Sequence, residues 1–212
     1  MSTSLAPQDI SLGLTTGLLY RPPNSSAAGG GSHEGGSQSG VVVLADAFGC
    51  GAPQVRRVSG LIAAQGFIAI VPDIYRNRPW RGERDTQGLL EWCRAQDRHR
   101  VMADIKEAVM FLREQGVTRI GAVGFCFGGE AALECATLEG VFDAVVSFYP
   151  TGLKPAVGAK LKSPALVVVG DRDEHIPPEA VRTLSEHLAA GGTVGEARLV
   201  EGQGHQFALR GG

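Results

Sequence analysis

The residues that decide the fold are RIGAVGFCFGGEAALECATL, numbers 119 to 138. They begin with a short apolar run typical of a buried strand and end with a run of helical period. Between the two, Gly124 and Gly128 stand two residues before and two residues after Cys126, in the pattern G-x-C-x-G. A strand that turns into a helix this sharply leaves no room for side chains at those positions. We therefore predict a nucleophile elbow that displays Cys126 at the end of a strand.

Short apolar runs alternate with segments of helical period along the rest of the chain. The expected strands are 41–45, 67–71, 120–123, 144–148, 165–169 and 197–200. The expected helices are 54–65, 97–115, 128–138 and 178–190, and residues 10–20 are expected to add an edge strand. This order needs crossover connections, so the prediction is an α/β protein with a mostly parallel central sheet and helices on both faces. Reactive groups in such sheets lie beyond the carboxyl ends of the strands.

Length and composition indicate a single domain over residues 1–212. A chain of 212 residues, 43% of them hydrophobic, is long and apolar enough to bury one substantial core. Residues 24–40, NSSAAGGGSHEGGSQSG, hold almost nothing apolar. We expect them to form a flexible loop, in which His33 is a solvated side chain without a role.

Charge and hydropathy argue against several kinds of partner. The net charge of −2 comes from acidic and basic residues mixed along the chain, without the basic run that would follow a phosphate backbone. The first ten residues lack the features of a signal peptide, and no window approaches the roughly 18 apolar residues of a membrane span. We expect a cytoplasmic protein that binds neither nucleic acid nor membrane.

The four cysteines are Cys50, Cys93, Cys126 and Cys135, and without an export signal we expect them to be reduced. None has a C-x-x-C or histidine-rich spacing, so no metal site is predicted. Cys126 is expected at the amino end of a helix, where unpaired N–H groups favour the reactive thiolate. The alternative is that Cys126 is a small buried apolar residue, as many free cysteines are. We adopt that interpretation for Cys93 and Cys135, whereas Cys50 is a candidate reactive thiol at the rim of the site.

Two later loops supply candidates for an acid and a base. Asp171 and Asp173 follow the strand ALVVVG, and His205 follows the strand EARLVEG. In the order cysteine, aspartate, histidine, His205 would accept the thiol proton and the aspartate would hold its tautomer. The alternative role of His205 is a local hydrogen bond. His175, on the same loop as the two aspartates, is the second choice for the base.

Six short motifs are specific when they occur together. They are LADAFG (44–49), PDIY (72–75), GFCFGG (124–129), FYPTG (148–152), GDRDEHIP (170–177) and GHQF (204–207). With them the sequence resembles the dienelactone hydrolase family (carboxymethylenebutenolidases), small α/β hydrolases with a cysteine nucleophile. The resemblance implies the α/β-hydrolase fold and, through the spacing G-x-x-D-x-x-V/I-P, selects Asp173 as the acid. It also implies an oxyanion hole made by the backbone N–H groups of Ala47 and Phe127.

The resemblance leaves further candidates for substrate binding or proton relay. Asp46 stands where characterised bacterial members have a glutamate that interacts with the resting thiol; its alternative role is to accept local N–H groups at a strand end. Arg76 and Arg78 flank Asn77, the position at which the family places an arginine for a substrate carboxylate. Tyr149 lies in the FYPTG motif. The family also has a long final helix, which the residues after the GHQF motif do not provide, so part of a sheet face is expected to be uncovered.

The family's reaction is the hydrolytic opening of a lactone, or of an activated ester, through an acyl-cysteine. It needs no metal or organic cofactor, and the implied partner is a small molecule, with or without a carboxylate of its own. Two other functions stay open at this stage. One is a broader carboxylesterase or thioesterase that uses the same three residues, and the other is a small-molecule receptor with the same pocket and little turnover.

Overall fold

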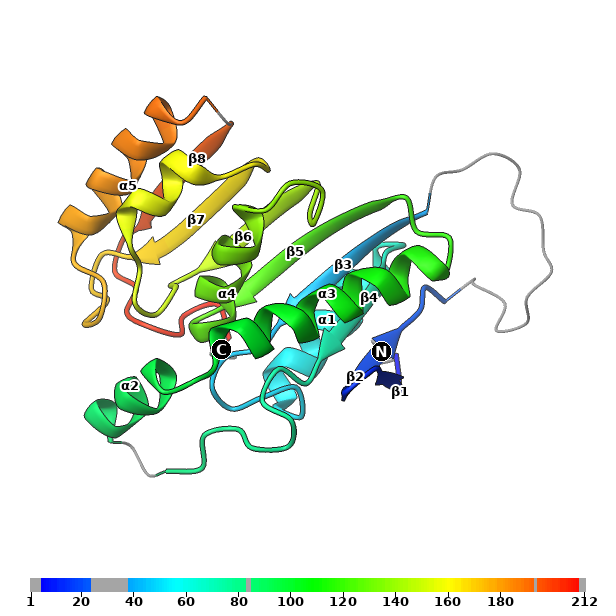
Figure 1. Cartoon of the computed structure of the whole chain (residues 1–212). Coiled ribbons are helices and arrows are strands. Elements are labelled where there is room, and N and C mark those ends of the chain that lie inside the picture. The colour runs from blue at the N-terminus through cyan, green and yellow to red at the C-terminus, as the bar shows by residue number, and fades with distance from the viewer. Residues whose placement is uncertain (1–4, 24–37, 83–84, 193, 210–212) are drawn as a thin grey trace.

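An eight-stranded sheet forms the centre of the protein (Figure 1). The computed structural model describes residues 5–23, 38–82, 85–192 and 194–209. The strands are β1 (Gln8–Leu12), β2 (Thr15–Tyr20), β3 (Ser39–Leu44), β4 (Ile68–Pro72), β5 (Arg119–Phe125), β6 (Ala144–Phe148), β7 (Ala165–Gly170) and β8 (Gly195–Val200). Their spatial order is β1-β2-β4-β3-β5-β6-β7-β8. The β1–β2 and β2–β4 pairs are antiparallel and all other pairs are parallel, which confirms the expected mostly parallel sheet.

The central strands are buried because they consist almost entirely of apolar and largely β-branched residues. Val42, Val43 and Leu44 of β3 are 0% exposed, as is every residue from Ile68 to Val71 in β4. Parallel strands that are covered on both faces show such continuous apolar runs rather than an alternation. The pairing of β3 with β5 sets Leu44 beside Gly124, so the two strands end at the same edge of the sheet.

Helices cover both faces of the sheet. They are α1 (Pro53–Ala64), α2 (Thr86–Arg94), α3 (Arg98–Glu114), α4 (Phe127–Ala136) and α5 (Pro178–Ala190), with a short 3₁₀ helix, η1 (Pro155–Lys160). In Figure 1, α3 and α5 lie in front of the sheet and α1 lies behind it. Both α1 and α3 pack on β3 and β4, whereas α4 packs on β5 and β6. Helix α3 begins where Asp97 accepts a hydrogen bond from the N–H of Arg100, an ordinary helix cap.

The amino-terminal residues depart from the sequence prediction. One edge strand is expected over residues 10–20, but the chain forms two strands there, joined by a turn in which Gly13 has a φ of 54°. Glycine adopts this left-handed conformation without strain. Strand β2 lies inside the sheet, between β1 and β4, and β1 is the edge.

Helix α2 is an element that the sequence pattern does not predict. It spans nine residues and contains Gly88, and glycine is a poor helix former. Packing holds the helix in place: the ring of Trp92 lies 5.1 Å from that of Tyr75 and 6.4 Å from that of Phe127. A short helix that depends on such contacts leaves little signal in its own sequence.

Most of the loop expected at residues 24–40 lies outside the described residues, because 24–37, His33 among them, are not described. Its last two residues belong to β3 instead. Ser39 and Gly40 pair in register with Arg119 and Ile120 of β5, and this pairing extends the strand backwards.

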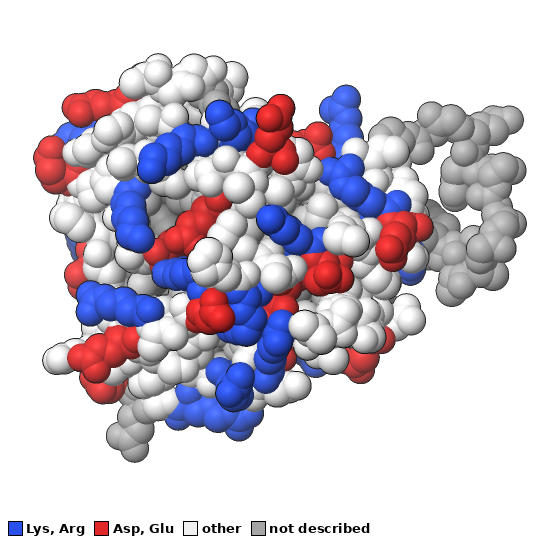
Figure 2. Space-filling view, viewed as in Figure 1, with Lys and Arg blue, Asp and Glu red and all other residues white. Residues whose placement is uncertain are grey.

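Lys and Arg side chains are interspersed with Asp and Glu over the face shown in Figure 2. Within the described ranges, no helix has the length and apolarity needed to cross a lipid bilayer. On the outer strand β8, Leu199 is 37% exposed.

The turn between β5 and α4 has no space for side chains beside Cys126. A Cβ atom at Gly124 would lie 2.3 Å from the carbonyl oxygen of Gly128, and one at Gly128 would lie 2.3 Å from that of Leu44. Cys126 itself has a φ of 52° and a ψ of −116°, a conformation that residues other than glycine rarely adopt. The backbone therefore has the sharp strand-to-helix turn that the sequence predicts.

We expect Gly128→Ala to destabilise the protein by about 1–3 kcal/mol, the cost typical of an overpacked interior, because the backbone of Leu44 and Ala45 must move away from the added methyl group. Gly60→Ala is the matched control. A Cβ atom at Gly60 on α1 would meet nothing within 4 Å, so this change should be neutral or stabilising by up to about 1 kcal/mol. Urea unfolding of the two variants measures the difference, and equal midpoints would contradict the tight turn.

Candidate active site

The backbone of Cys126 is held by hydrogen bonds from three directions. Its N–H donates to the carbonyl oxygen of Phe148 over 3.0 Å, and its own carbonyl accepts from the N–H groups of Glu130 and Thr151, each over 3.1 Å. Surrounding structure that fixes a residue in this way can maintain an unfavourable backbone conformation. The residue is 2% exposed, so its thiol lies beneath the surface at the amino end of α4.

Asp173 lies in the loop between β7 and α5 and accepts hydrogen bonds with both carboxylate oxygens. Oδ1 accepts from the N–H groups of His175 (2.8 Å) and Ile176 (3.1 Å), and Oδ2 lies 2.8 Å from Nδ1 of His205. Burial by itself raises the pKa of this carboxyl group, but the hydrogen bond and charge of His205 and the two N–H groups outweigh burial and lower the pKa below its usual value. Asp173 is therefore a stable carboxylate.

The loop that carries His205 is tied to the loop that carries the acid. The N–H of Arg172 donates to the carbonyl oxygen of Gln203 over 2.9 Å. At the end of β7, a Cβ atom on Gly170 would lie 2.1 Å from the same oxygen. This close approach, which only glycine permits, sets the distance between the two loops. In the described structure Asp171 bonds through its N–H to the carbonyl oxygen of Val200, whereas the contact with His205 is made by Asp173.

His205 interacts with the side chains of Asp173 and Cys126. Burial lowers the pKa of the imidazole, but the hydrogen bonds with these two side chains and their negative charges raise it to about 9. Because Asp173 occupies Nδ1, the hydrogen bond to the sulfur falls to Nε2. The structure thus brings together the three residues that the sequence analysis put forward as nucleophile, base and acid.

Thr151 is a neighbour of the thiol that the sequence analysis did not identify. Its Oγ1 lies 2.7 Å from Sγ of Cys126, and the residue is 4% exposed. The threonine stands in the FYPTG motif just after β6. The sequence could have indicated this residue, because Thr151 follows a predicted strand and side chains beyond the carboxyl ends of parallel strands lie at the active-site edge of the sheet. The sulfur therefore has two hydrogen-bonding neighbours, an imidazole and a hydroxyl group.

The two residues put forward for the oxyanion hole are buried close to the elbow. Ala47 follows β3 and Phe127 is the first residue of α4, so the N–H of Phe127 has no acceptor within its helix. Asp46 accepts a hydrogen bond from the N–H of Phe48 over 3.1 Å, the local contact considered as its alternative role. Burial raises the pKa of Asp46 to about 6, although the bond from Phe48 and the charge of His205 oppose the rise. No hydrogen bond between Asp46 and Cys126 occurs in the described part of the chain.

Two rings pack against His205. The ring of Tyr149, which has a φ of 38° and is 0% exposed, lies 4.9 Å from the imidazole. The ring of His175 lies 4.7 Å from it, edge to face. Burial and the positive charge of His205 lower the pKa of His175. Tyr149 is thus a wall of the histidine pocket, and His175 is a neutral neighbour rather than an alternative partner of Asp173.

The structure does not bring the two candidate arginines to the site. Arg76 turns away and forms an ion pair with Asp104 of α3, with 2.7 Å between Nη2 and Oδ1. Arg78 lines a different cavity, beside Tyr75 and Trp92. The reason is that α3 offers a buried carboxylate, Asp104 being 1% exposed, and a buried carboxylate without a cation is strongly unfavourable.

A cavity of about 630 Å³ opens beside His205. It is lined by Phe48, Trp80, Gly82, Asp85, Thr86, Leu89, Glu174, His175, His205 and Gln206. These residues come from the loop after β3, from the connection between β4 and α2, from α2 itself and from the two loops of the acid and the histidine. Its size suits a small-molecule substrate.

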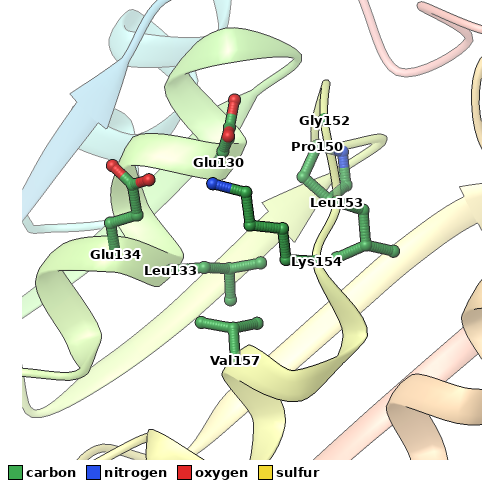
Figure 3. A pocket seen from close by; sticks show the side chains of 8 residues that line it. All are labelled: Glu130, Leu133, Glu134, Pro150, Gly152, Leu153, Lys154 and Val157. Carbon is green, nitrogen blue, oxygen red and sulfur yellow. The ribbon is translucent and has the colours of Figure 1, made fainter. Parts of the chain in front are cut away.

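A second pocket is lined in part by Pro150 and Gly152. Figure 3 shows Glu130, Leu133, Glu134, Lys154 and their neighbours around it, with the Lys154 side chain reaching toward Glu130. Its volume is about 40 Å³, enough for a water molecule or so and too small for a substrate. The larger cavity is therefore the candidate substrate site.

The other thiols have environments that disfavour the thiolate. Burial raises the pKa of Cys50 to about 11, and it raises the pKa of Cys93 and of Cys135 to about 12. Among the described residues, no group of three or more His, Cys, Asp or Glu side chains is arranged to hold a metal ion.

A mostly parallel sheet whose fifth strand turns sharply into a helix, with a nucleophilic side chain at the turn, defines the α/β hydrolases, and the chain has this fold. Within that class, the model of the dienelactone hydrolase family matches residues 28–212. The chain belongs to this family, which confirms the resemblance seen in the sequence and identifies a carboxylic ester hydrolase.

Individual relatives agree with this assignment. The chain is 31% identical to a carboxymethylenebutenolidase homolog of Xenopus tropicalis over 173 residues, which are 80% of this chain and 70% of that protein. It is 30% identical to the Homo sapiens homolog over 173 residues, 80% of this chain and 71% of that one. The structure of a putative dienelactone hydrolase from Klebsiella pneumoniae superimposes with a TM-score of 0.83 at 20% identity, covering 98% of this chain and 90% of the other.

The two histidines should titrate far apart. In an NMR titration we expect the pKa of His205 at about 9, whereas that of His175 lies below the ordinary value of 6.5. Asp173→Asn should lower the pKa of His205 by about one unit or more, because it removes the adjacent negative charge. Asp171→Asn, the matched control, should leave it unchanged.

The same shift has a consequence for stability. Since the pKa of His205 is raised from 6.5 to about 9 on folding, its stabilising effect is complete below pH 6.5 and is lost as the pH rises through 9. The melting temperature of the native protein should therefore fall over this interval, and that of Asp173→Asn should fall less. A native melting temperature that stays constant between these values would argue against a protonated His205.

Proposed function

We propose that the protein hydrolyses lactones or activated esters through Cys126, His205 and Asp173, with an acyl-cysteine intermediate. The observation that carries this proposal is the hydrogen-bonded series from Asp173 to His205 to Cys126 at the elbow. A histidine with a pKa of about 9 is protonated at neutral pH, which makes it a suitable partner for a thiolate. Membership of the dienelactone hydrolase family supports the same class of reaction.

In the first half of the reaction the sulfur of Cys126 attacks the carbonyl carbon. The carbonyl oxygen becomes an oxyanion, which accepts hydrogen bonds from the N–H groups of Ala47 and Phe127; one such donor is typically worth about 10²–10³ in rate. The bond from carbon to the ester oxygen then breaks, and the protonated His205 gives its proton to that oxygen. The product of this half-reaction is an acyl-cysteine, and in a lactone the released hydroxyl stays attached to the acyl chain.

In the second half water attacks the acyl-cysteine. The neutral His205 accepts a proton from the water, the oxyanion forms again, and its collapse expels the thiolate of Cys126 beside a protonated His205. One water has been added across one ester bond, and the enzyme is restored. Asp173 stays ionised throughout and holds the imidazole with Nε2 toward the sulfur.

The use of sulfur limits the substrates. A thiolate is itself a good leaving group, so the first tetrahedral intermediate tends to return to reactants unless the ester oxygen leaves readily as a phenolate or enolate. We therefore propose activated esters and strained or enol lactones as substrates, and expect simple alkyl esters and amides to react poorly. Each step draws on side chains, backbone N–H groups and water, without a metal or organic cofactor.

The test of the nucleophile is site-specific alkylation. We expect iodoacetamide at neutral pH to label Cys126 at least about tenfold faster than Cys93 and Cys135, whose thiolates are disfavoured by burial. Loss of lactone hydrolysis should be proportional to labelling at Cys126. Cys126→Ser should fold normally and lose roughly 99% of the activity or more. Cys50→Ser is the matched control, because it makes the same change outside the three proposed catalytic residues, and it should retain the activity.

The outcomes of that experiment separate the remaining functions. Full activity in the alkylated protein or in Cys126→Ser would reject the cysteine mechanism. Faster turnover of thioesters or of varied aryl esters than of lactones would favour a broader thioesterase or carboxylesterase. Tight binding of lactones with no turnover by the native protein would favour a receptor.

Thr151 supplies a further prediction. Its hydroxyl group, 2.7 Å from Sγ of Cys126, can donate to a thiolate but has no comparable interaction with the acylated sulfur. Thr151→Val keeps the shape and removes the donor, so we expect the alkylation rate of Cys126 and the rate of enzyme acylation to fall about tenfold. The acid limb of the pH–rate profile should move to higher pH while KM stays similar. Thr151→Ser should restore native behaviour; if it behaves like the valine variant, the hydroxyl group is not responsible.

A further inference from the structure

The cavity beside His205 is lined by charged as well as apolar side chains. Its lining includes the carboxylates of Asp85 and Glu174, and no lysine or arginine occurs among its described lining residues. Two histidines, His175 and His205, also line it. Burial and the charge of His205 lower the pKa of His175, whereas the pKa of His205 is raised to about 9. Among the described lining residues, two carboxylates therefore outnumber the one positive charge, that of His205, at neutral pH.

Three arginines of the neighbouring segments are paired with carboxylates outside the cavity. Arg76 and Arg100 both bind the carboxylate of Asp104, and Arg98 binds that of Glu130 while its guanidinium stacks on Phe127, 4.5 Å from the ring centre. Redirecting Arg98 to a ligand would leave Glu130 without its cation, and redirecting Arg76 or Arg100 would remove one of the two cations that bind the buried Asp104, which is costly. A substrate carboxylate that lies away from His205 would thus face the two like charges of the lining.

The apolar part of the lining is flat and aromatic. Trp80, Phe48 and Leu89 line the cavity, and Phe48 is 46% exposed. The indole of Trp80 packs closely on two glycines. A Cβ atom added to Gly82 would lie 2.1 Å from the ring, and one added to Gly88 would lie 3.2 Å from it. Aromatic faces bind flat apolar groups and also attract cations, especially where carboxylates stand nearby.

A backbone hydrogen bond links Trp80 to the proposed reacting centre. The N–H of Trp80 donates to the carbonyl oxygen of Ala47 over 2.8 Å, so the tryptophan is anchored to the residue whose own N–H is proposed to hold the oxyanion. A group that stacks on the indole is thereby located relative to the carbonyl under attack.

We propose that this cavity selects lactones or esters that carry a flat apolar group, uncharged or cationic, and that it discriminates against substrates bearing a carboxylate. The inference rests on the function proposed above and adds the substrate class. It assigns Trp80 and Phe48 as the binding platform and Glu174 and Asp85 as the residues that reject negative charge.

The experiment uses three 3,4-dihydrocoumarins that carry a methyl, a trimethylammonium or a carboxylate group at the same ring position. Their affinity for Cys126→Ala is measured by calorimetry, because this variant binds without turnover. At low ionic strength we expect the carboxylate compound to bind at least about tenfold more weakly than the trimethylammonium compound, with the methyl compound between them. Added salt should reduce the difference, since the two carboxylates face solvent.

Neutral variants of Glu174 and Asp85 test whether these two carboxylates cause the preference. Glu174→Gln combined with Asp85→Asn, both in the Cys126→Ala background, should reduce the preference to about threefold or less, mainly by improving binding of the carboxylate compound. Glu186→Gln, an exposed position on α5, removes the same charge away from the cavity and should leave the preference unchanged. Trp80→Ala should weaken all three compounds together.

Binding affinity tests the substrate class, and turnover tests the proposed function. Equal affinities, or tighter binding of the carboxylate compound, would overturn the proposed substrate class, whatever the rates are. Turnover by the native protein decides the proposed function independently: hydrolysis of none of the three would reject it, even where the affinities follow the predicted order.

Discussion

The site depends on one close contact, between the start of α4 and the end of β3. Gly128 lies so near the carbonyl oxygens of Leu44 and Ala45 that a Cβ atom would come within 2.3 and 2.5 Å of them. This approach sets the amino end of the helix beside the residues that follow β3, so that the thiol of Cys126 and the N–H groups of Phe127 and Ala47 gather at one edge of the sheet. The strained backbone of the cysteine is the consequence, and neighbouring strands hold it in place through backbone hydrogen bonds.

The acid and the base follow from a second constraint, the pairing of β7 with β8. Asp173 and His205 are 32 residues apart in sequence, yet parallel neighbouring strands end at the same edge, and the bond from Arg172 to Gln203 joins their loops directly. The pair is almost fully buried, with side-chain exposures of 0% and 5%. Burial of this kind is tolerable because two backbone N–H groups and the imidazole satisfy the carboxylate.

The parts of the site that the sequence predicted are those that local geometry controls. The glycines around Cys126 and the spacing from Asp173 to Ile176 and Pro177 express turns of a few residues, and the sheet follows from continuous apolar runs. Other features depend on partners distant in sequence. Arg76 binds Asp104, 28 residues away, which no spacing near PDIY reveals; helix α2 depends on an aromatic cluster; and Thr151 comes to the thiol only because β6 lies beside β5. The single-domain assignment and the catalytic roles remain predictions from the sequence.

The two neighbouring histidines show how the site controls where its positive charge lies. Their rings are 4.7 Å apart, so two imidazolium ions would repel each other strongly, and only one of them can easily be charged. Asp173 selects which: it contacts His205 through the ring but contacts His175 through the backbone N–H, so only the first ring gains a counter-ion. The positive charge is thereby held next to Asp173, on the part of the cavity lining that His205 forms. The exposed carboxylates of Asp85 and Glu174 belong to other parts of the same lining, and the proposed discrimination against an anionic substrate rests on them.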